Sequence, residues 1–396
     1  MESVKNSRKL VMFSCCFLLI NIYVLVGAQD GAHKYVWQTK LLNDLLANYH
    51  KGVPPSLNGS PGPAVTVDLR FSLVNFDFID EANEVATVYG WFYQAWNDPR
   101  LMWDPASYNG TDVMKINAND VWLPDIEMFN TGTVVQNLDS DVMVYSTGMV
   151  HRVPSVQITF ICRMDFKFFP YDNQVCQLKF GSWHYHADVI ILTQSIDDID
   201  LSSHERSRNF ELTNTSAKRN VMKYECCPEK YIDITYTLHL KRVSSAYSVK
   251  LVLPAALTGF LILATFLLPP ASYEKITLCG LIFIALLLQL IYLHDIVPAS
   301  GDTILGDYFA FALFIDFFAT IIAAVSYNVH VRSSPKMQQH SSIMMKEMEG
   351  DDRDLRMKMP QNQSKIGFLR YLDFVCFVIF GIVFIVGMAI ILGRRG

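Results

Sequence analysis

Four long apolar runs in the second half of the chain constrain its fold more than any other feature of the sequence. A helix needs roughly 20 mostly apolar residues to cross the hydrocarbon core of a membrane. The runs approach or exceed that length and cover residues 246–268, 276–293, 308–330 and 369–393. Composition agrees with lipid contact, because hydrophobic residues make up 51% of the chain and charged residues only 18%. The sequence therefore predicts a membrane protein with four transmembrane helices.

Residues 1–28 have the pattern of a cleaved secretory signal peptide. Basic residues stand near the start, an apolar stretch runs from Leu10 to Val26, and the small residues Gly27 and Ala28 follow. The export machinery reads this order of basic, apolar and small residues. A retained signal anchor is the alternative interpretation.

Export of the N-terminus determines the expected position of every later segment. Residues 29–245 are then extracellular, and residues 246–330 hold the first three spans. Residues 331–365 form a short cytoplasmic loop, whose basic residues suit the positive-inside bias. Residues 366–396 hold the fourth span and a short extracellular tail.

The charged and reactive side chains exclude several functions. The net charge is only −5, and no block rich in Lys and Arg precedes the first span, so we expect no nucleic-acid partner. No nucleophile–base motif occurs, so we expect no enzyme and no cofactor. His184 and His186 lack a third ligand in register, so we expect no metal site. Lys250 and Asp316 lie inside the first and third runs, where ionisable groups usually face protein rather than lipid.

The extracellular segment is predicted to be mainly β-structure. It begins with an amphipathic helix that places Leu41, Leu42, Leu45, Leu46 and Tyr49 on one face. Apolar residues then alternate from Val65 to Leu73, as in a half-buried strand, and change phase at Val74, which predicts a β-bulge near 73–74. A second alternation from Ile234 to Leu240 leads into the first span without a linker.

Removal of the signal peptide leaves four extracellular cysteines, which are Cys162, Cys176, Cys226 and Cys227. Four cysteines allow three disulfide pairings, and the sequence alone does not choose among them. A disulfide between adjacent residues is strained, so counting favours a separate partner for each of Cys226 and Cys227. Asn109 and Asn214 begin Asn-X-Ser/Thr motifs and are expected to carry glycans.

Several segments together resemble one family. The cysteine loop CRMDFKFFPYDNQVC is followed by QLKFGSW, then by YECCPEKY, and then by four spans, with SYEK before the second. Over about residues 35–393 this order resembles the Cys-loop pentameric ligand-gated ion channels, and most closely a nicotinic-acetylcholine-receptor-like α-type subunit of invertebrate kind. The resemblance implies an extracellular β-sandwich ligand-binding domain, four transmembrane α-helices and assembly as a pentamer. It also implies the pairings Cys162–Cys176 and Cys226–Cys227.

The resemblance places a ligand site between neighbouring subunits. One subunit supplies Phe129, Trp183, Tyr224, Cys226, Cys227 and Tyr231, and its neighbour supplies Trp91, with His151 and Val153 as weaker correspondences. Electron-rich ring faces attract a cation, at about 0.5–2 kcal/mol for each contact. Phe129 stands where the family usually has tyrosine, and His186 stands where it usually has an acid. The expected agonist is therefore acetylcholine or another small cationic ligand.

The resemblance also selects residues for the pore and for coupling. One face of the second helix reads Glu274, Thr277, Leu281, Ile284, Leu288, Ile291 and Asp295, whose five copies would form acidic rings around aliphatic layers. Composition alone favours a buried or lipid-facing helix instead. Residues expected to couple the ligand site to the pore are Asp80, Glu81, Phe169, Pro170, Lys179, Asp233, Arg242 and Pro298, with an ion pair between Glu81 and Arg242. Lys179 and Asp233 are expected to act together with Tyr224.

These expectations define a ligand-gated cation channel subunit in the plasma membrane, with a postsynaptic membrane as one candidate setting. Both faces of the ligand site occur in one chain, which favours a homopentamer. The expected partners are four further subunits, a small cationic agonist, monovalent cations with calcium left open, and membrane lipid. A modulatory subunit of a heteropentamer, or a chemoreceptor subunit that does not itself bind acetylcholine, is the alternative.

Overall fold

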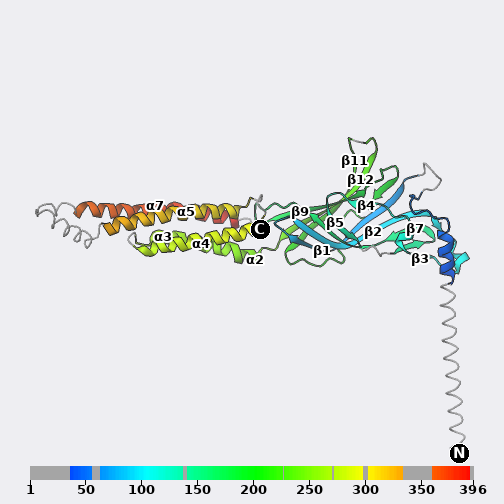
Figure 1. Ribbon diagram of the computed structural model, residues 1–396, viewed down its shortest axis with the longest axis horizontal. Coiled ribbons are helices and arrows are strands. Elements are labelled where there is room, and N and C mark those ends of the chain that lie inside the picture. Colours follow the sequence, from blue (N-terminus) through cyan, green and yellow to red (C-terminus); the bar gives the residue numbers. More distant parts are fainter. Residues whose placement is uncertain are drawn as a thin grey trace, which may run out of the picture.

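The computed structural model describes residues 36–55, 63–136, 141–225, 227–269, 272–297, 302–332 and 359–392. Within these ranges the chain is elongated, with a β-domain that continues directly into a bundle of long helices (Figure 1). The predicted signal peptide and most of the predicted cytoplasmic loop lie outside the described residues.

Two sheets form the β-domain. The larger sheet runs β10 (Ile190–Thr193), β1 (Val65–Asp80), β2 (Val85–Met102), β7 (Thr147–Arg152), β6 (Val142–Tyr145) and β3 (Val113–Ile116), and β8 (Ser155–Ile161) joins β2 to β5 (Thr131–Gln136). The smaller sheet runs β11 (Phe210–Lys223), β12 (Lys230–Arg242), β9 (Asn173–Ser182) and β4 (Ile126–Met128). Short 3-10 turns occupy η1 (Pro105–Tyr108) and η2 (Ala118–Asp120). The predicted β-sandwich is confirmed.

Strand β1 shows why the sequence pattern folds in this way. Val67, Leu69, Phe71 and Leu73 point inward and are fully buried. The register against β2 then shifts between Leu73 and Asn75, which confirms the predicted bulge. The shift lets the second half of the strand bury its own apolar side chains despite the change of phase.

Aromatic rings join the two sheets at the centre of the sandwich. Phe71 on β1 lies 5.8 Å from Tyr236 on β12, and Phe92 on β2 lies 4.7 Å from Phe180 on β9, measured between ring centroids. The Tyr236 hydroxyl donates to the Leu69 carbonyl across the same interface. These contacts hold the two sheets in a fixed orientation relative to each other.

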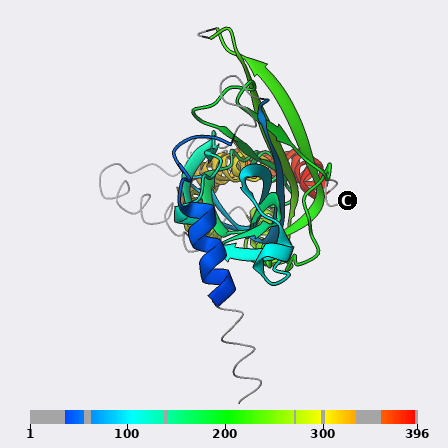
Figure 2. The same ribbon diagram turned by 90° about the vertical axis from the view of Figure 1, so that its right-hand side faces the viewer.

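A helix over residues 36–46 covers the end of the β-domain farthest from the bundle (Figure 2). Leu41 on this helix is fully buried, as its apolar face predicts. Beyond the helix, the Tyr49 hydroxyl donates to Asp98 at 2.6 Å, and Arg100 binds the same carboxylate. The Trp122 backbone N–H donates to the Tyr49 hydroxyl, which ties the helix to the sandwich.

Among the described residues, three helices are long and apolar enough to cross a membrane, which are Ser245–Leu267, Tyr273–Ile296 and Ile304–Val329. The first comprises α2 (Ser245–Tyr247), η3 (Ser248–Val252) and α3 (Leu253–Leu267), and the others lie in α4 (Tyr273–Ile296) and α5 (Ile304–Arg332). The fourth predicted span falls in α7 (Met359–Leu392), whose described apolar stretch is Asp373–Val386. The helices begin before the predicted apolar runs, because polar residues occupy their first turns.

Ionisable side chains inside the bundle take different positions. Asp316 is fully buried, and within the described ranges neither of its carboxylate oxygens has a hydrogen-bond partner. Lys250 is exposed in the single chain, so the expectation that it faces protein stays a prediction. Lys250 lies in the first turns of its span, where a long side chain reaches the membrane surface. Lys275 on α4 is fully buried and binds Asp373 on α7 at 2.8 Å.

The ion pair between Lys275 and Asp373 generates a stability prediction. Replacing one partner leaves the other charge buried alone, so Lys275→Met or Asp373→Leu alone should destabilise the protein by about 3–5 kcal/mol. The double variant should recover most of this loss, because two apolar side chains then pack together. Thermal unfolding of the detergent-solubilised variants measures the effect. Strictly additive losses in the double variant would contradict the pairing.

Candidate functional site

Four aromatic side chains gather at one end of the smaller sheet. Phe129 follows β4, Trp183 follows β9, and their ring centroids are 5.9 Å apart with an edge-to-face orientation. Tyr224 follows β11, Tyr231 lies at the start of β12, and these rings are 5.6 Å apart. Trp183 is 59% exposed and Tyr224 is 41% exposed, a large apolar surface to leave open to solvent. The structure therefore shows two ring pairs with accessible faces.

The backbone of β9 fixes the position of Phe129. Its N–H donates to the Lys179 carbonyl at 2.8 Å, and the neighbouring Asn130 side chain bonds to the backbone of Lys179 and Gln177. A Cβ atom at Gly181 would lie 2.4 Å from the Phe129 ring. Glycine at this position thus allows the ring to pack closely against the strand.

Asp125 organises the turn that carries Trp183. Its carboxylate accepts from the Ser182 hydroxyl at 2.6 Å and from the His184 backbone N–H at 2.7 Å. The His184 imidazole lies 3.0 Å from the same carboxylate, whereas His186 lies 3.5 Å from Asp188. The two histidines lie in this turn and contact different carboxylates. Within the described ranges, no group of three or more His, Cys, Asp or Glu side chains could hold a metal ion.

The hairpin between β11 and β12 projects from the domain beside these rings (Figure 1). Cys227 at its tip is disulfide-bonded, and Cys226 lies outside the described residues, so the adjacent pairing stays a prediction. Behind the hairpin, Lys179 binds Asp233 at 3.3 Å, and Asn220 donates to the same carboxylate. The third expected partner, Tyr224, instead packs against Tyr231.

The residues expected from a neighbouring subunit lie on the larger sheet. Trp91 on β2 is 41% exposed, Val153 after β7 is 47% exposed, and His151 on β7 is half-buried. One chain therefore carries both sets of residues on different sheets. A second chain is needed to bring the two sets together in a single site.

His151 lies between two tyrosines that the sequence did not single out. Its ring centroid is 5.0 Å from that of Tyr145 and 5.5 Å from that of Tyr93. Burial lowers the pKa of His151, and the charge of Arg70 lowers it further, whereas Asp68 acts in the opposite direction. The imidazole is therefore neutral at pH 7.

Arg242, at the end of β12, is fully buried between two carboxylates. Its Nε lies 2.7 Å from Asp172, and Nη1 lies 2.6 Å from Glu81, so the expected ion pair between Glu81 and Arg242 is present. The guanidinium also lies against the rings of Phe169, Phe210 and Tyr247. Burial raises the pKa of Glu81, and the attraction of Arg242 offsets part of this effect. Asp80 instead bonds to Asn83 in its own turn.

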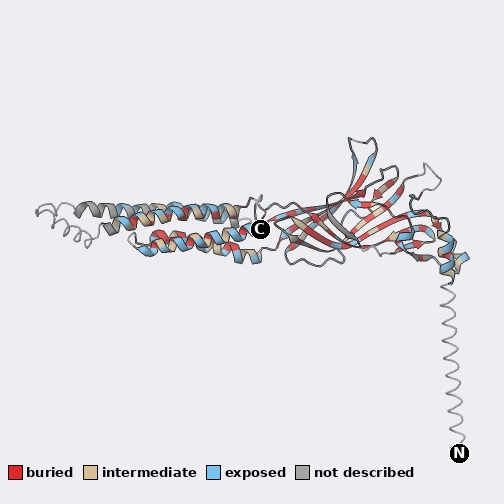
Figure 3. Ribbon diagram, viewed as in Figure 1, coloured by how far each residue is buried: buried red, intermediate tan, exposed pale blue. Residues whose placement is uncertain are grey.

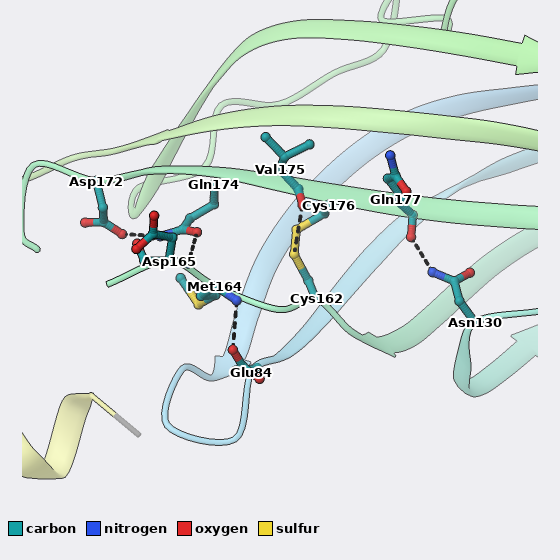
Figure 4. The surroundings of a disulfide bond; sticks show 10 residues. All are labelled: Glu84, Asn130, Cys162, Met164, Asp165, Asp172, Gln174, Val175, Cys176 and Gln177. Atoms are coloured by element: carbon teal, nitrogen blue, oxygen red, sulfur yellow. Dashed lines mark hydrogen bonds between the residues drawn. A yellow bond between two sulfur atoms is a disulfide. The ribbon is translucent and has the colours of Figure 1, made fainter. Parts of the chain in front are cut away.

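The cysteine loop contacts the helices directly. Cys162 and Cys176 form the disulfide that closes it, which confirms that pairing (Figure 4). Phe166 and Phe169 belong to the buried cluster of the helix bundle. The Lys167 carbonyl accepts from Ile304, the first residue of α5, at 3.1 Å.

A further contact runs from the loop to the first span, where the Tyr171 and Ser248 hydroxyls are 3.0 Å apart. The expected Pro170 is buried in this region, whereas Pro298 lies outside the described residues. The sequence did not single out Asp172 or Tyr171, although both belong to the FPYD segment on which the resemblance rests.

Helix α4 presents one complete face to solvent in the single chain (Figure 3). This face contains Glu274, Thr277, Leu281, Ile284, Leu288, Ile291 and Asp295, all exposed. The opposite face packs into the bundle through Lys275, Cys279, Ile282, Leu286 and Leu293. The expected glycan sites, Asn109 and Asn214, are exposed as well.

The contacts of Arg242 generate a prediction about coupling. Lysine keeps the charge but loses the planar fork that binds carboxylates and stacks on rings. Arg242→Lys should therefore leave cation binding at the distant aromatic rings unchanged within a few-fold and abolish most of the evoked current. Surface-expressed protein, radioligand binding and current are measured together, with exposed Lys241→Gln as the control. Equal losses of binding and current in Arg242→Lys would contradict a role of Arg242 in coupling rather than in binding.

Comparison with known proteins agrees with the geometry. A family model for the neurotransmitter-gated ion-channel ligand binding domain matches residues 38–244. The chain is 32% identical over 326 residues to the acetylcholine receptor subunit alpha-type acr-16 of Caenorhabditis elegans, which covers 81% of this chain and 64% of the relative. It is 32% identical to the neuronal acetylcholine receptor subunit alpha-2 of Mus musculus, with 81% and 62% covered.

A third relative, the acetylcholine receptor subunit alpha-type unc-63 of Caenorhabditis elegans, is 30% identical, with 80% of this chain and 68% of the relative covered. The match to the first two relatives spans slightly less than two thirds of their length. The family model alone covers more than half of this chain. The chain therefore belongs to the neurotransmitter-gated ion-channel family of Cys-loop receptors, which are not enzymes, and it is similar to the α-type subunits of nicotinic acetylcholine receptors.

Proposed function

We propose that this chain is a subunit of a ligand-gated cation channel in the plasma membrane, and that five copies of it assemble around a pore. A small cationic agonist, acetylcholine or a related ammonium compound, binds between neighbouring subunits. Binding opens a pathway lined by α4 for monovalent cations. The observation that carries this proposal is the set of exposed aromatic rings on the smaller sheet, with Trp183 59% exposed.

The chemistry of these rings favours a cation. Phe129, Trp183, Tyr224 and Tyr231 offer π-faces within two neighbouring ring pairs. A cation that loses water on binding gains about 0.5–2 kcal/mol from each face. The hairpin that carries Tyr224 can fold over such a ligand, because it projects from the domain (Figure 1). A set of aromatic rings also suits a quaternary ammonium, which donates no hydrogen bond.

The exposed face of α4 supports a cation pathway. Glu274 lies in the first turn of the helix and Asp295 in the last, with four aliphatic positions between them. Rings of carboxylates concentrate cations, and an apolar constriction can close by excluding water. In a single chain this face is exposed and largely apolar. Assembly of five copies around a common axis would turn this face of each α4 toward a shared pore.

A modulatory subunit of a heteropentamer is the second candidate. One observation favours it: the region around His151 on the larger sheet carries Arg70, stacked on Tyr93. A subunit that contributes only its larger sheet to the ligand site would use this surface alone. The two ring pairs on the smaller sheet of the same chain favour the complete site instead.

Expression of the chain alone in oocytes tests the proposed function. We expect an agonist-evoked current whose reversal potential follows the sodium gradient and not the chloride gradient. Trp183→Ala should raise the agonist concentration needed for half-maximal current by about 2- to 30-fold, the equivalent of one lost cation–π contact. Trp37→Ala, on the helix at the far end of the domain, is the matched control and should have no such effect. A chloride-dependent reversal potential would overturn the proposal, and current only with a co-expressed relative would favour the modulatory candidate.

The neutral state of His151 predicts how the response depends on pH. Burial and Arg70 hold its pKa below the ordinary value, and the surrounding groups are Asp68, Tyr93 and Tyr145. Protonation therefore needs a more acidic solution than an ordinary histidine does, and it places a new positive charge on the face that meets a cationic agonist. The half-maximal concentration of choline should rise between pH 7.5 and pH 5.5 in the natural protein and stay nearly constant in His151→Gln. An equal rise in the variant would show that another group titrates.

A further inference from the structure

A basic and aromatic cluster beside Trp91 remains unexplained by binding of a simple cation. It consists of Asp68 and Arg70 on β1, Tyr93 on β2, Tyr145 on β6 and His151 on β7. The cluster occupies the outer surface of the larger sheet, beside the residue expected to contact the agonist. A cation placed so close to a site for cations calls for a chemical reason.

The strand register fixes where Arg70 lies. Val67, Leu69 and Phe71 are buried, so Arg70 points to the outer surface of β1. Arg70 pairs with Tyr93 across the ladder, and Ser72 pairs with Trp91. Residues two apart on a strand are separated by roughly 7 Å, so Arg70 and Trp91 occupy diagonally neighbouring positions on this surface.

Arg70 is held by stacking more firmly than by its ion pair. Its Cζ lies 3.8 Å from the centroid of the Tyr93 ring. Its Nε lies 3.1 Å from Asp68, but the angle does not suit a hydrogen bond, and within the described ranges this buried nitrogen has no other partner. Asp68 is already occupied, because it accepts from the Ser195 backbone N–H and hydroxyl at 2.8 and 2.9 Å.

The guanidinium therefore keeps unused donors and an effective positive charge. About a third of the Arg70 side chain is exposed. Burial lowers the pKa of the neighbouring His151, the charge of Arg70 lowers it further, and Asp68 acts in the opposite direction. A planar guanidinium binds carboxylates through two parallel hydrogen bonds, which a cationic ligand cannot accept.

We propose that the agonist is a zwitterion, an ammonium group joined by a short aliphatic spacer to a carboxylate, and that Arg70 of the neighbouring copy binds the carboxylate. The ammonium group lies among Trp183, Phe129 and the tyrosines, and the spacer passes Trp91. His151 adds a neutral imidazole beside Arg70. This assignment rests on the proposed function, because it uses the same interface between subunits.

A matched pair of ligands tests the assignment. γ-Trimethylammonio butyrate carries the carboxylate, and its methyl ester has the same ammonium group and spacer without the negative charge. In the natural protein the zwitterion should be the more potent activator. Arg70→Gln should weaken the zwitterion by roughly 10- to 150-fold, the range for hydrogen bonds to charged groups, and should affect the ester much less. Binding by competition with a labelled antagonist is measured beside the current.

A second variant has the opposite expected effect. Asp68→Asn removes the carboxylate that competes for Arg70, so it should strengthen the zwitterion relative to the ester. Arg208→Gln is the matched control, because Arg208 is exposed and adjoins Asn209, which contacts Val243 at the membrane end of the domain. It should change both ligands equally or not at all.

The outcomes separate this assignment from the proposed function. Activation by the ester but not by the zwitterion overturns the zwitterion assignment and leaves the cation channel intact. Equal losses for both ligands in Arg70→Gln also overturn it, because Arg70 then only braces Tyr93. Absence of current with either ligand, together with absence of binding, counts against the proposed function itself.

Discussion

The buried charge of Arg242 is the interaction on which the relation between the two parts of this protein depends. A guanidinium without water needs counter-charges and hydrogen bonds around it, and here Asp172 and Glu81 supply both. The three residues belong to β12, to the cysteine loop and to the turn between β1 and β2. None of these segments can move from the others without leaving a charge unpaired in the interior. The network therefore fixes the end of the β-domain that adjoins the helix bundle.

Strand β12 connects this network to the aromatic rings. It contains 13 residues and begins beside Tyr231, at the end of the hairpin. It therefore spans roughly 40 Å from the rings to Arg242. Asp233 near its upper end binds Lys179, and Arg242 ends the strand three residues before the first helix begins at Ser245. A stiff, fully paired strand transmits displacement along its length better than a flexible linker does. We therefore propose that this strand transmits movement of the hairpin to the helices, and that the phenylalanines of the cysteine loop transmit it to the bundle core.

The sequence predicted those features that depend on local periodicity or on a dense motif. Examples are the alternation in β1, its bulge at Leu73 and the long apolar helices. Each of these features depends on residues that lie close together in the sequence. The pairing of Cys162 with Cys176 followed from the resemblance rather than from counting. Asp172, Tyr171 and the cluster around His151 were missed, because their roles arise from segments that meet only in the folded chain.

The two halves of the proposed ligand site would contribute differently to selectivity. Cation–π attraction depends mainly on the ammonium group of the ligand, so the rings around Trp183 would accept many amines with similar energies. The face with Arg70 and His151 contains hydrogen-bond donors in fixed positions, and donors discriminate because a ligand without a matching acceptor leaves them unpaired. Selectivity among amines should therefore be determined mainly by the larger sheet. A pentamer that mixes this chain with a relative would keep the aromatic half and change its ligand through the neighbour's face alone.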